Sequence, residues 1–186
     1  MRSLPIALSA LLAIGALATT AYASTKVYGS GLASSCSKLA IAGQFDRQTL
    51  STCDLAIETE AMGRENAAKT HVNRGIVLLR RESFSKAADD FRRAEQLMPD
   101  LAEIYINRGV VLIRQKRWTE ALAQFDKGIS LNPDELEKAH YNRAIAREQV
   151  DDIRGAYMDY RKASELAPEW ELPKKELSRY TVRRAT

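Results

Sequence analysis

The sequence predicts an all-α protein, an α-solenoid of antiparallel helix pairs. The triplet Asn73-Arg74-Gly75 recurs as Asn107-Arg108-Gly109 and Asn142-Arg143-Ala144, at intervals of 34 and then 35 residues. Small, aromatic and proline residues follow each triplet at fixed offsets, as in the series Pro99, Pro133 and Pro168. Between these positions apolar residues recur with spacings of three and four, which is the pattern of one helix face. A helix pair of this kind covers its apolar face only by stacking on a neighbour.

Residues 1–23 have the features of a secretory signal peptide. Arg2 is followed by a largely apolar run over 4–18, and Ala21-Tyr22-Ala23 is a small-residue cleavage site, so we expect cleavage between Ala23 and Ser24. The alternative is a membrane-spanning helix that is retained, but the apolar run is shorter than the ~20 residues that cross a bilayer. No cysteine follows the cleavage site, so a lipoprotein anchor is not supported.

Residues 24–67 are expected to form a degenerate helical pair, over 34–43 and 46–62. The only two cysteines of the chain, Cys36 and Cys53, lie in this pair. An even cysteine count in an exported chain favours one disulfide over free thiols. A metal site would need further Cys or His residues nearby, and there are none.

Three repeats are expected over 68–101, 102–136 and 137–170. Their helices are predicted at 68–81 and 85–97, at 102–115 and 119–131, and at 137–150 and 153–166. Gly75, Gly109 and Ala144 would lie where the first helix of a pair approaches Ala87, Ala121 and Ala156 on the second. The aromatic residues Phe91, Phe125 and Tyr160 would fill the wider space beside them.

Residues 171–186 are expected to form a C-terminal capping helix, at 172–184. Its basic residues are Lys174, Lys175, Arg179, Arg183 and Arg184. They are explained either by a solvated helix face or by an acidic partner or anionic lipid surface.

From 68 to 170 the sequence resembles three tandem tetratricopeptide repeats. The resemblance implies a concave groove, lined by the first helix of each pair, that holds a peptide or a helix of a partner. The groove positions that carry over are Lys69, Val72, Ile76, Arg80, Ile106, Val110, Ile113, Arg114, Tyr141, Ile145 and Gln149. Most of them are apolar, so we expect an apolar floor, with Arg80 and Arg114 placed to set the register of a bound segment.

Three occupants of this groove are open at the sequence level, because large apolar surfaces are rarely left bare. They are a partner protein or peptide, a second copy of the chain, and the chain's own N-terminal segment. Relatives that clamp chaperone tails have lysine and asparagine at two groove positions. Here those positions are Val72 and Ile76, which argues against a chaperone tail as the ligand. We expect Arg74, Arg108 and Arg143 to pair with Asp90, Asp126 or Asp159, and the repeated asparagines to satisfy backbone groups of the preceding repeat.

The sequence indicates no enzyme and no cofactor or metal. His71 and His140 share one repeat position, where a packing role is favoured, and no phosphate-binding loop or nucleophile motif is present. With 28 basic and 24 acidic residues, the charge is too even to indicate nucleic acid. The sequence thus predicts a periplasmic scaffold with a protein partner, no stable membrane insertion, and self-association as the alternative.

Overall fold

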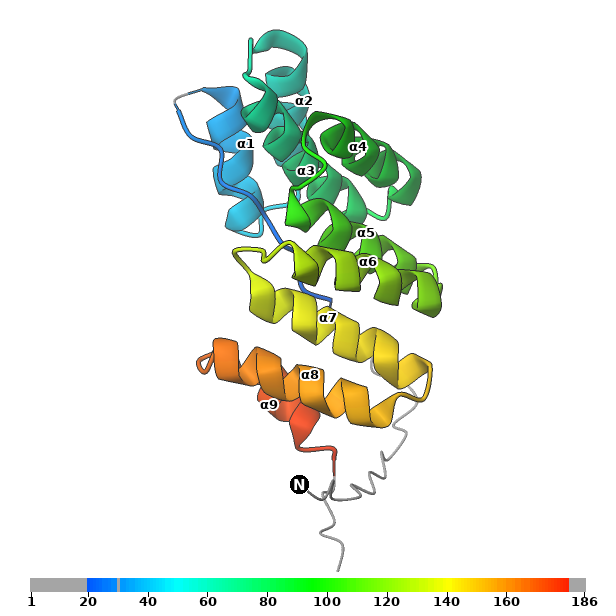
Figure 1. Ribbon diagram of the computed structural model, residues 1–186. Helices are drawn as coiled ribbons and strands as arrows, with labels where there is room; N and C mark the ends of the chain where they lie inside the picture. The colour runs from blue at the N-terminus through cyan, green and yellow to red at the C-terminus, as the bar shows by residue number, and fades with distance from the viewer. Residues whose placement is uncertain (1–19, 30, 181–186) are drawn as a thin grey trace, which may run out of the picture.

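A computed structural model describes residues 20–29 and 31–180. Within these residues the chain forms nine α-helices and no β-strand. The helices stack in order as antiparallel pairs, with the last helix against the end of the stack (Figure 1). Their bounds are α1 Leu32–Ile41, α2 Arg47–Thr59, α3 Arg64–Arg80, α4 Phe84–Leu97, α5 Ala102–Arg114, α6 Trp118–Ser130, α7 Leu136–Gln149, α8 Ile153–Leu166 and α9 Glu171–Leu177. The predicted all-α solenoid is confirmed.

The six repeat helices begin and end within one residue of the expected positions, except that α3 begins four residues early, at Arg64. Each pair is joined by the same tight turn. Glu82, Lys116 and Asp151 adopt a left-handed backbone with φ of 59–60°. The following amide of each turn donates to a carbonyl five residues back, for example from Ser83 to Leu78. This bond pattern ends a helix abruptly and reverses the chain.

The glycines of the repeated triplet face an aromatic ring. A Cβ added to Gly75 would lie 2.5 Å from Cε1 of Phe91, and one added to Gly109 would meet Phe125 in the same way. The expected partners Ala87 and Ala121 are fully buried, but the ring is what requires the glycine. In the third repeat Ala144 and Tyr160 hold the corresponding positions, and both are buried. The Tyr160 hydroxyl donates to Glu148 (3.2 Å).

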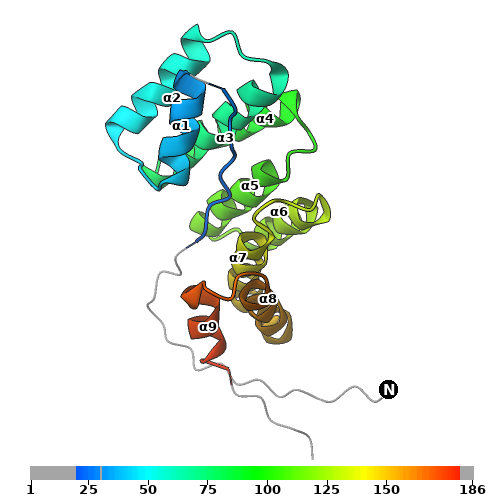
Figure 2. The same cartoon turned by 90° about the vertical axis from the view of Figure 1, so that its left-hand side faces the viewer.

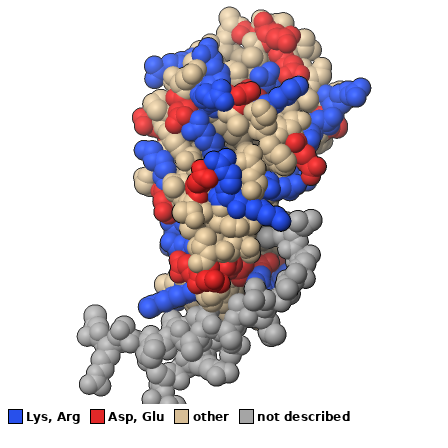
Figure 3. Space-filling model, turned by 90° about the vertical axis from the view of Figure 1, so that its right-hand side faces the viewer, with Lys and Arg blue, Asp and Glu red and all other residues tan. Residues whose placement is uncertain are grey.

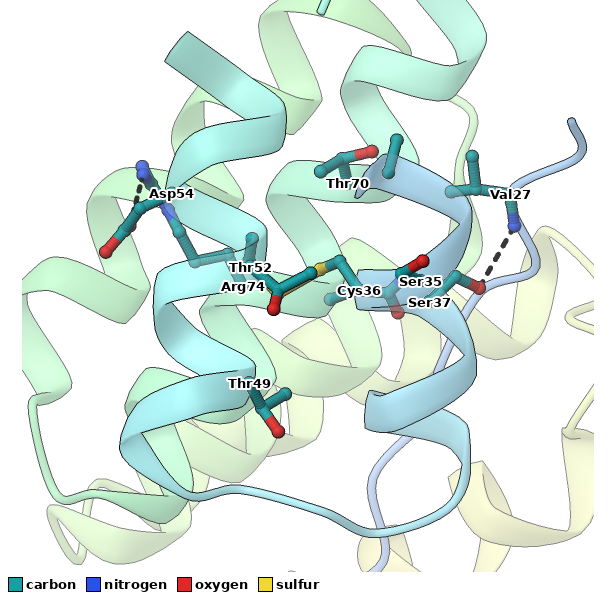
Figure 4. Close-up of a disulfide and its surroundings, with 12 residues drawn as sticks. Val27, Ser35, Cys36, Ser37, Thr49, Thr52, Asp54, Thr70 and Arg74 are labelled. Atoms are coloured by element: carbon teal, nitrogen blue, oxygen red, sulfur yellow. Dashed lines mark hydrogen bonds and ion pairs between the residues drawn. A yellow bond between two sulfur atoms is a disulfide. The ribbon is translucent and has the colours of Figure 1, made fainter. Parts of the chain in front are cut away.

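The N-terminal pair is closed by the Cys36–Cys53 disulfide, as predicted, with Cα atoms 5.0 Å apart (Figure 4). Both cysteines are fully buried and pack with Val77 of α3. The bridge thus joins α1 and α2 covalently inside a small buried cluster. At the other end, α9 stops at Leu177 rather than continuing to 184, and Tyr180 packs on Tyr157 and Tyr160 of α8. Arg183 and Arg184 lie outside the described residues.

Charges of both signs are mixed over the face shown in Figure 3, without a single-sign field. The basic residues at the C-terminal end are partly matched inside the chain. Lys174 of α9 pairs with Glu171, and Arg179, which follows α9, pairs with Glu148 and Glu176. None of the described helices combines the length and apolar character needed to cross a bilayer.

Candidate functional site

An extended segment of the chain itself, residues 20–28, lies along the first helices of the repeats. It runs from α7 past α5 to α3 and then enters α1 (Figure 2). Its odd-numbered residues Ala23, Thr25 and Val27 are buried, whereas Lys26 and Tyr28 are exposed. Alternate residues of an extended chain point to opposite sides. The segment therefore presents its odd-numbered side chains to the concave face, as a bound peptide would.

The three repeated asparagines hold this segment by its backbone. Asn142 accepts from the amide of Ala21 (3.0 Å) and donates to its carbonyl (2.6 Å). The same pair of bonds joins Asn107 to Ala23 (3.3 and 2.8 Å) and Asn73 to Thr25 (3.1 and 2.8 Å). We call Asn73, Asn107 and Asn142 the asparagine ladder.

The expectation for these asparagines is corrected by this arrangement. They do satisfy backbone groups, but those of the N-terminal segment rather than of the preceding repeat. The physical reason is that the N–H and C=O of one extended residue point the same way, and a carboxamide offers one acceptor and two donors to meet them. A sequence signal existed, since a polar residue repeated on a buried helix face needs a partner for each polar atom.

Other groups complete the hydrogen bonds of the segment. Lys138 donates to the carbonyl of Tyr22 (3.2 Å), and the amide of Ser24 donates to Oε2 of Glu135 (2.9 Å). On α1, the Ser37 hydroxyl accepts from the amide of Val27 (3.1 Å) and donates to the carbonyl of Thr25 (2.7 Å) (Figure 4). Nearly all polar contacts of the segment are therefore to its backbone.

The residues of the predicted apolar floor are buried. Ala23 has no exposed surface and belongs to the same buried cluster as the floor residues. The floor residues are Val72, Ile76, Ile106, Val110, Ile113, Tyr141 and Ile145, each at most 7% exposed. Some of this burial is packing between helices, because Ile106 lies against Gly128 of α6.

The polar groove positions have other partners. Arg80 stacks over the rings of Tyr22 (5.3 Å) and Phe45 (5.1 Å), so it does contact the segment. Arg114 pairs with Glu82 (2.9 Å) at the exposed rim. Lys69 pairs with Glu65 and its carbonyl accepts from the Thr25 hydroxyl (3.1 Å), while Gln149 is exposed at the end of α7. The asparagine ladder sets the register of the N-terminal segment. That Arg80 and Arg114 set the register of a partner stays a prediction.

The arginines of the repeated triplet bind carboxylates within the solenoid, as expected. Arg74 pairs with Asp90 (2.8 Å), and Arg143 pairs with Asp159 (2.8 Å) and Asp126 (2.7 Å). Arg108 differs, because its partner is Glu95 (2.6 Å).

The two histidines join these carboxylates. His71 lies 2.8 Å from Asp90 and His140 lies 2.7 Å from Asp159. Burial acts to raise the pKa of Asp159, but the bonds from Arg143 and His140 outweigh it and hold that pKa below its ordinary value. These clusters bind the two helices of a pair to each other, and through Asp126 and Asp54 they also reach the preceding pair. None of the bonds described joins them to residues 20–28.

An acidic corner borders the segment where Ser24 meets α7. Glu103 and Asp134 line a cavity of about 260 Å³ together with Thr25 and Lys26. Burial, followed by the charges of Asp134 and Glu135, raises the pKa of Glu103 above its ordinary value. Among the described residues no group of three or more His, Cys, Asp or Glu side chains is arranged to hold a metal ion.

The architecture and the groove define an α-solenoid whose concave side accommodates an extended polypeptide. Residues 102–135, the second repeat, match the family model of the tetratricopeptide repeat. In a comparison with curated proteins, no significant sequence match was found.

Solved structures share this fold at low sequence identity. PilW, described as a widely conserved type IV pilus biogenesis factor, is 22% identical with a TM-score of 0.67, over 81% of this chain and 69% of that one. The TPR domain of Arabidopsis OM64 is 23% identical with a TM-score of 0.58, over 63% and 96%. The second TPR domain of human RPAP3, solved in complex with an HSP70 peptide, is 22% identical with a TM-score of 0.56, over 62% and 96%. These likenesses show a tetratricopeptide-repeat fold.

Proposed function

We propose that this protein is a non-enzymatic scaffold that binds an extended segment of a partner polypeptide along α3, α5 and α7. The observation that supports it most is the asparagine ladder, which binds both backbone groups of every second residue of an extended chain. A neighbour of the same fold, the RPAP3 domain, was solved with a bound peptide. Binding of a segment by its backbone is consistent with a scaffold role.

The contacts also indicate what kind of segment fits. Side chains on the buried side of the bound chain are small, because Ala23 is wholly enclosed between the first helices. Backbone bonds supply affinity that depends little on sequence, and the enclosed positions supply selectivity. An extended segment is favoured over an amphipathic helix, since a helix has its amides and carbonyls already bonded and offers none to the ladder.

We further propose that residues 1–23 are removed on export and that the protein acts in the periplasm of a bacterium. The Cys36–Cys53 disulfide supports this location, because such bonds persist in oxidising compartments.

The function is tested by crosslinking in the cell envelope of the source organism. A photoreactive residue replaces Gln149, a predicted groove position that is exposed at the end of α7, and the matched control replaces Lys162, which is exposed on α8. We expect a crosslinked polypeptide from position 149 that is absent from 162. The same product should be lost when Asn107→Asp and Asn142→Asp are added, because a carboxylate cannot donate to the bound carbonyl.

Two results would contradict the proposal. One is a crosslink profile that is identical for both positions, and the other is full capture by the double asparagine variant. Products containing only this chain would support self-association instead. A charged residue at Ile106 would be a poor probe, since that side chain is fully buried and the variant would report on folding.

A further inference from the structure

We infer that cleavage between Ala23 and Ser24 converts the groove from a self-occupied to an open state. In the open state the new amino group of Ser24 is held in the acidic corner, and the Asn107 and Asn142 end of the ladder accepts a partner segment with small residues two positions apart. This inference rests on the proposed function, and it names both the event that opens the groove and the chemistry of the occupant.

The position of Ser24 carries the first step. Its nitrogen lies 2.9 Å from Oε2 of Glu135, the residue that precedes the first turn of α7. Cleavage would change this neutral amide into an ammonium without moving it. A charged donor on a carboxylate makes a stronger hydrogen bond than an amide does.

The surrounding charges favour that ammonium. The cavity beside Thr25 is lined by Asp100, Glu103 and Asp134, and Glu135 adjoins it, which makes four carboxylates. The lysines here are Lys26, Lys69 and Lys138, of which Lys69 also pairs with Glu65 and Lys138 with Glu135. Counting Glu65, five carboxylates face three lysines, so this part of the molecule has an excess of negative charge, which the amino group of Ser24 would reduce.

The rest of the segment would stay in place after cleavage. Thr25 remains bonded to Asn73, and Val27 to Ser37 of α1, which the disulfide fixes to α2. The retained residues therefore close one end of the groove at the first repeat, and only the part over α5 and α7 becomes available.

Residues 20–23 describe the occupant of the vacated part. Successive asparagines of the ladder bind every second residue of an extended chain. Asn142 and Asn107 therefore bind residues i and i+2 of the occupant. At these positions the structure holds Ala21 and Ala23. The intervening residue packs near Arg80, where Tyr22 lies now, and the chain runs from α7 towards α5. The partner is thus an extended segment with two small residues flanking one of any size.

The inference is tested first by the intact mass of the exported full chain, for which we expect an N-terminus at Ser24. Two shortened chains are then compared, one beginning at Ser24 and one at Thr20. Both retain all nine described helices and the disulfide, and circular dichroism checks that both fold. The probe is a fluorescent peptide with the sequence of residues 14–23, followed by anisotropy.

We expect the chain from Ser24 to bind this peptide and the chain from Thr20 to bind it at least about tenfold more weakly, because its site is filled. Asn107→Asp with Asn142→Asp should weaken binding to the Ser24 chain by about tenfold or more, since the two bonds donated to the peptide carbonyls are lost and a carboxylate oxygen faces each carbonyl instead. A peptide with tryptophan in place of Ala23 should not bind. Equal binding to both chains, or none to either, would overturn the inference.

Glu135→Gln tests the amino group separately. It should lower the urea midpoint of the Ser24 chain more than that of the Thr20 chain, because only the former has an ammonium group at Ser24, next to Glu135. Equal shifts would show that the corner does not hold the new terminus. If the peptide-binding and Glu135→Gln experiments fail while envelope crosslinking at position 149 succeeds, the scaffold role stands. Only the opening of the groove by cleavage, which we call the processing switch, is then wrong. If the peptide binds but no envelope crosslink forms, the processing switch stands and the proposed scaffold role is wrong.

Discussion

Gly75 lies directly beneath the ring of Phe91, so close that an added methyl group would be 2.5 Å from Cε1. The same contact recurs between Gly109 and Phe125 in the next repeat. Real Cβ atoms do not approach carbon this closely, and both phenylalanines are fully buried. Neither partner can give way without disturbing its neighbours, because protein interiors are closely packed.

We therefore predict that Gly75→Ala lowers the free energy of unfolding by roughly 1–3 kcal/mol, the usual size of an overpacking effect. Urea denaturation of the purified protein measures it. Gly63→Ala is the matched control, since nothing lies within 4 Å of a Cβ at that position. A change at Gly75 no larger than that of the control would show that the ring moves aside freely.

The sequence was sufficient for the helix pairs but not for what fills the groove. Helix bounds follow from periodic apolar residues, turns and prolines, all of which act locally. The pairing of Asn107 with Ala23 joins residues 84 apart and depends on the assembled stack. From the sequence alone, Ala21 and Ala23 are explained as part of a predicted cleavage site. The alternation of small residues that continues to Thr25 and Val27 is therefore not interpreted as a segment that binds the groove.

The C-terminal helix shows a different limit of sequence reasoning. The basic run beyond Leu177 has ordinary helix propensity, which favoured a helix to 184. In the structure α9 stops at Leu177, and Tyr180 packs on Tyr157 and Tyr160 of α8. Its hydroxyl bonds to Glu148 of α7. Tertiary packing outweighed the weak local preference.

The disulfide gives a second prediction. Cys36→Ala with Cys53→Ala should lower the free energy of unfolding by about 3 kcal/mol, because the bridge closes a loop of 17 residues in the unfolded chain. Hydrogen exchange should show α1 and α2 opening before α5 to α8, since this pair relies on the bridge rather than on a large aromatic core. The double variant and the reduced wild type should behave alike. Uniform opening of the whole stack would contradict this.

Glu103 gives a prediction of pH dependence. Its pKa is raised in the folded state by burial and then by Asp134 and Glu135, so the folded chain holds its proton to a higher pH than the unfolded chain does. Between the two pKa values, stability contributed by this group falls as pH rises. Above both values Glu103 is charged in the folded and in the unfolded chain, and the full cost of burying its charge lowers the stability of the fold.

Glu103→Gln should therefore raise the urea midpoint at pH 7 in the form that retains residues 20–23. The gain should fade as pH falls below about 4.3, the ordinary value for glutamate, where the wild-type residue is neutral in both states. Glu169→Gln, at an exposed position, serves as the control and should show little change. A gain that is constant with pH would mean that shape rather than charge is responsible.

Arg143 allows a comparison of two carboxylates on one guanidinium. Asp159 is 4% exposed and Asp126 is 60% exposed, and they lie 2.8 and 2.7 Å from Arg143. Removing the charge of the buried partner leaves a half-buried cation without its main counter-charge, for which the loss is typically about 3–5 kcal/mol. An exposed pair contributes about 0–1 kcal/mol because water screens it.

We predict that Asp159→Asn destabilises the protein at pH 7 by about 3 kcal/mol and that Asp126→Asn does so by less than about 1 kcal/mol. Because the pKa of Asp159 is held below its ordinary value, its contribution is present above about pH 4 and is lost as pH falls through the folded-state pKa. The two stability curves, wild type and Asp159→Asn, should therefore converge in acid. Urea titrations from pH 7 to pH 3 measure this, and parallel curves would show that Asp159 acts through packing alone.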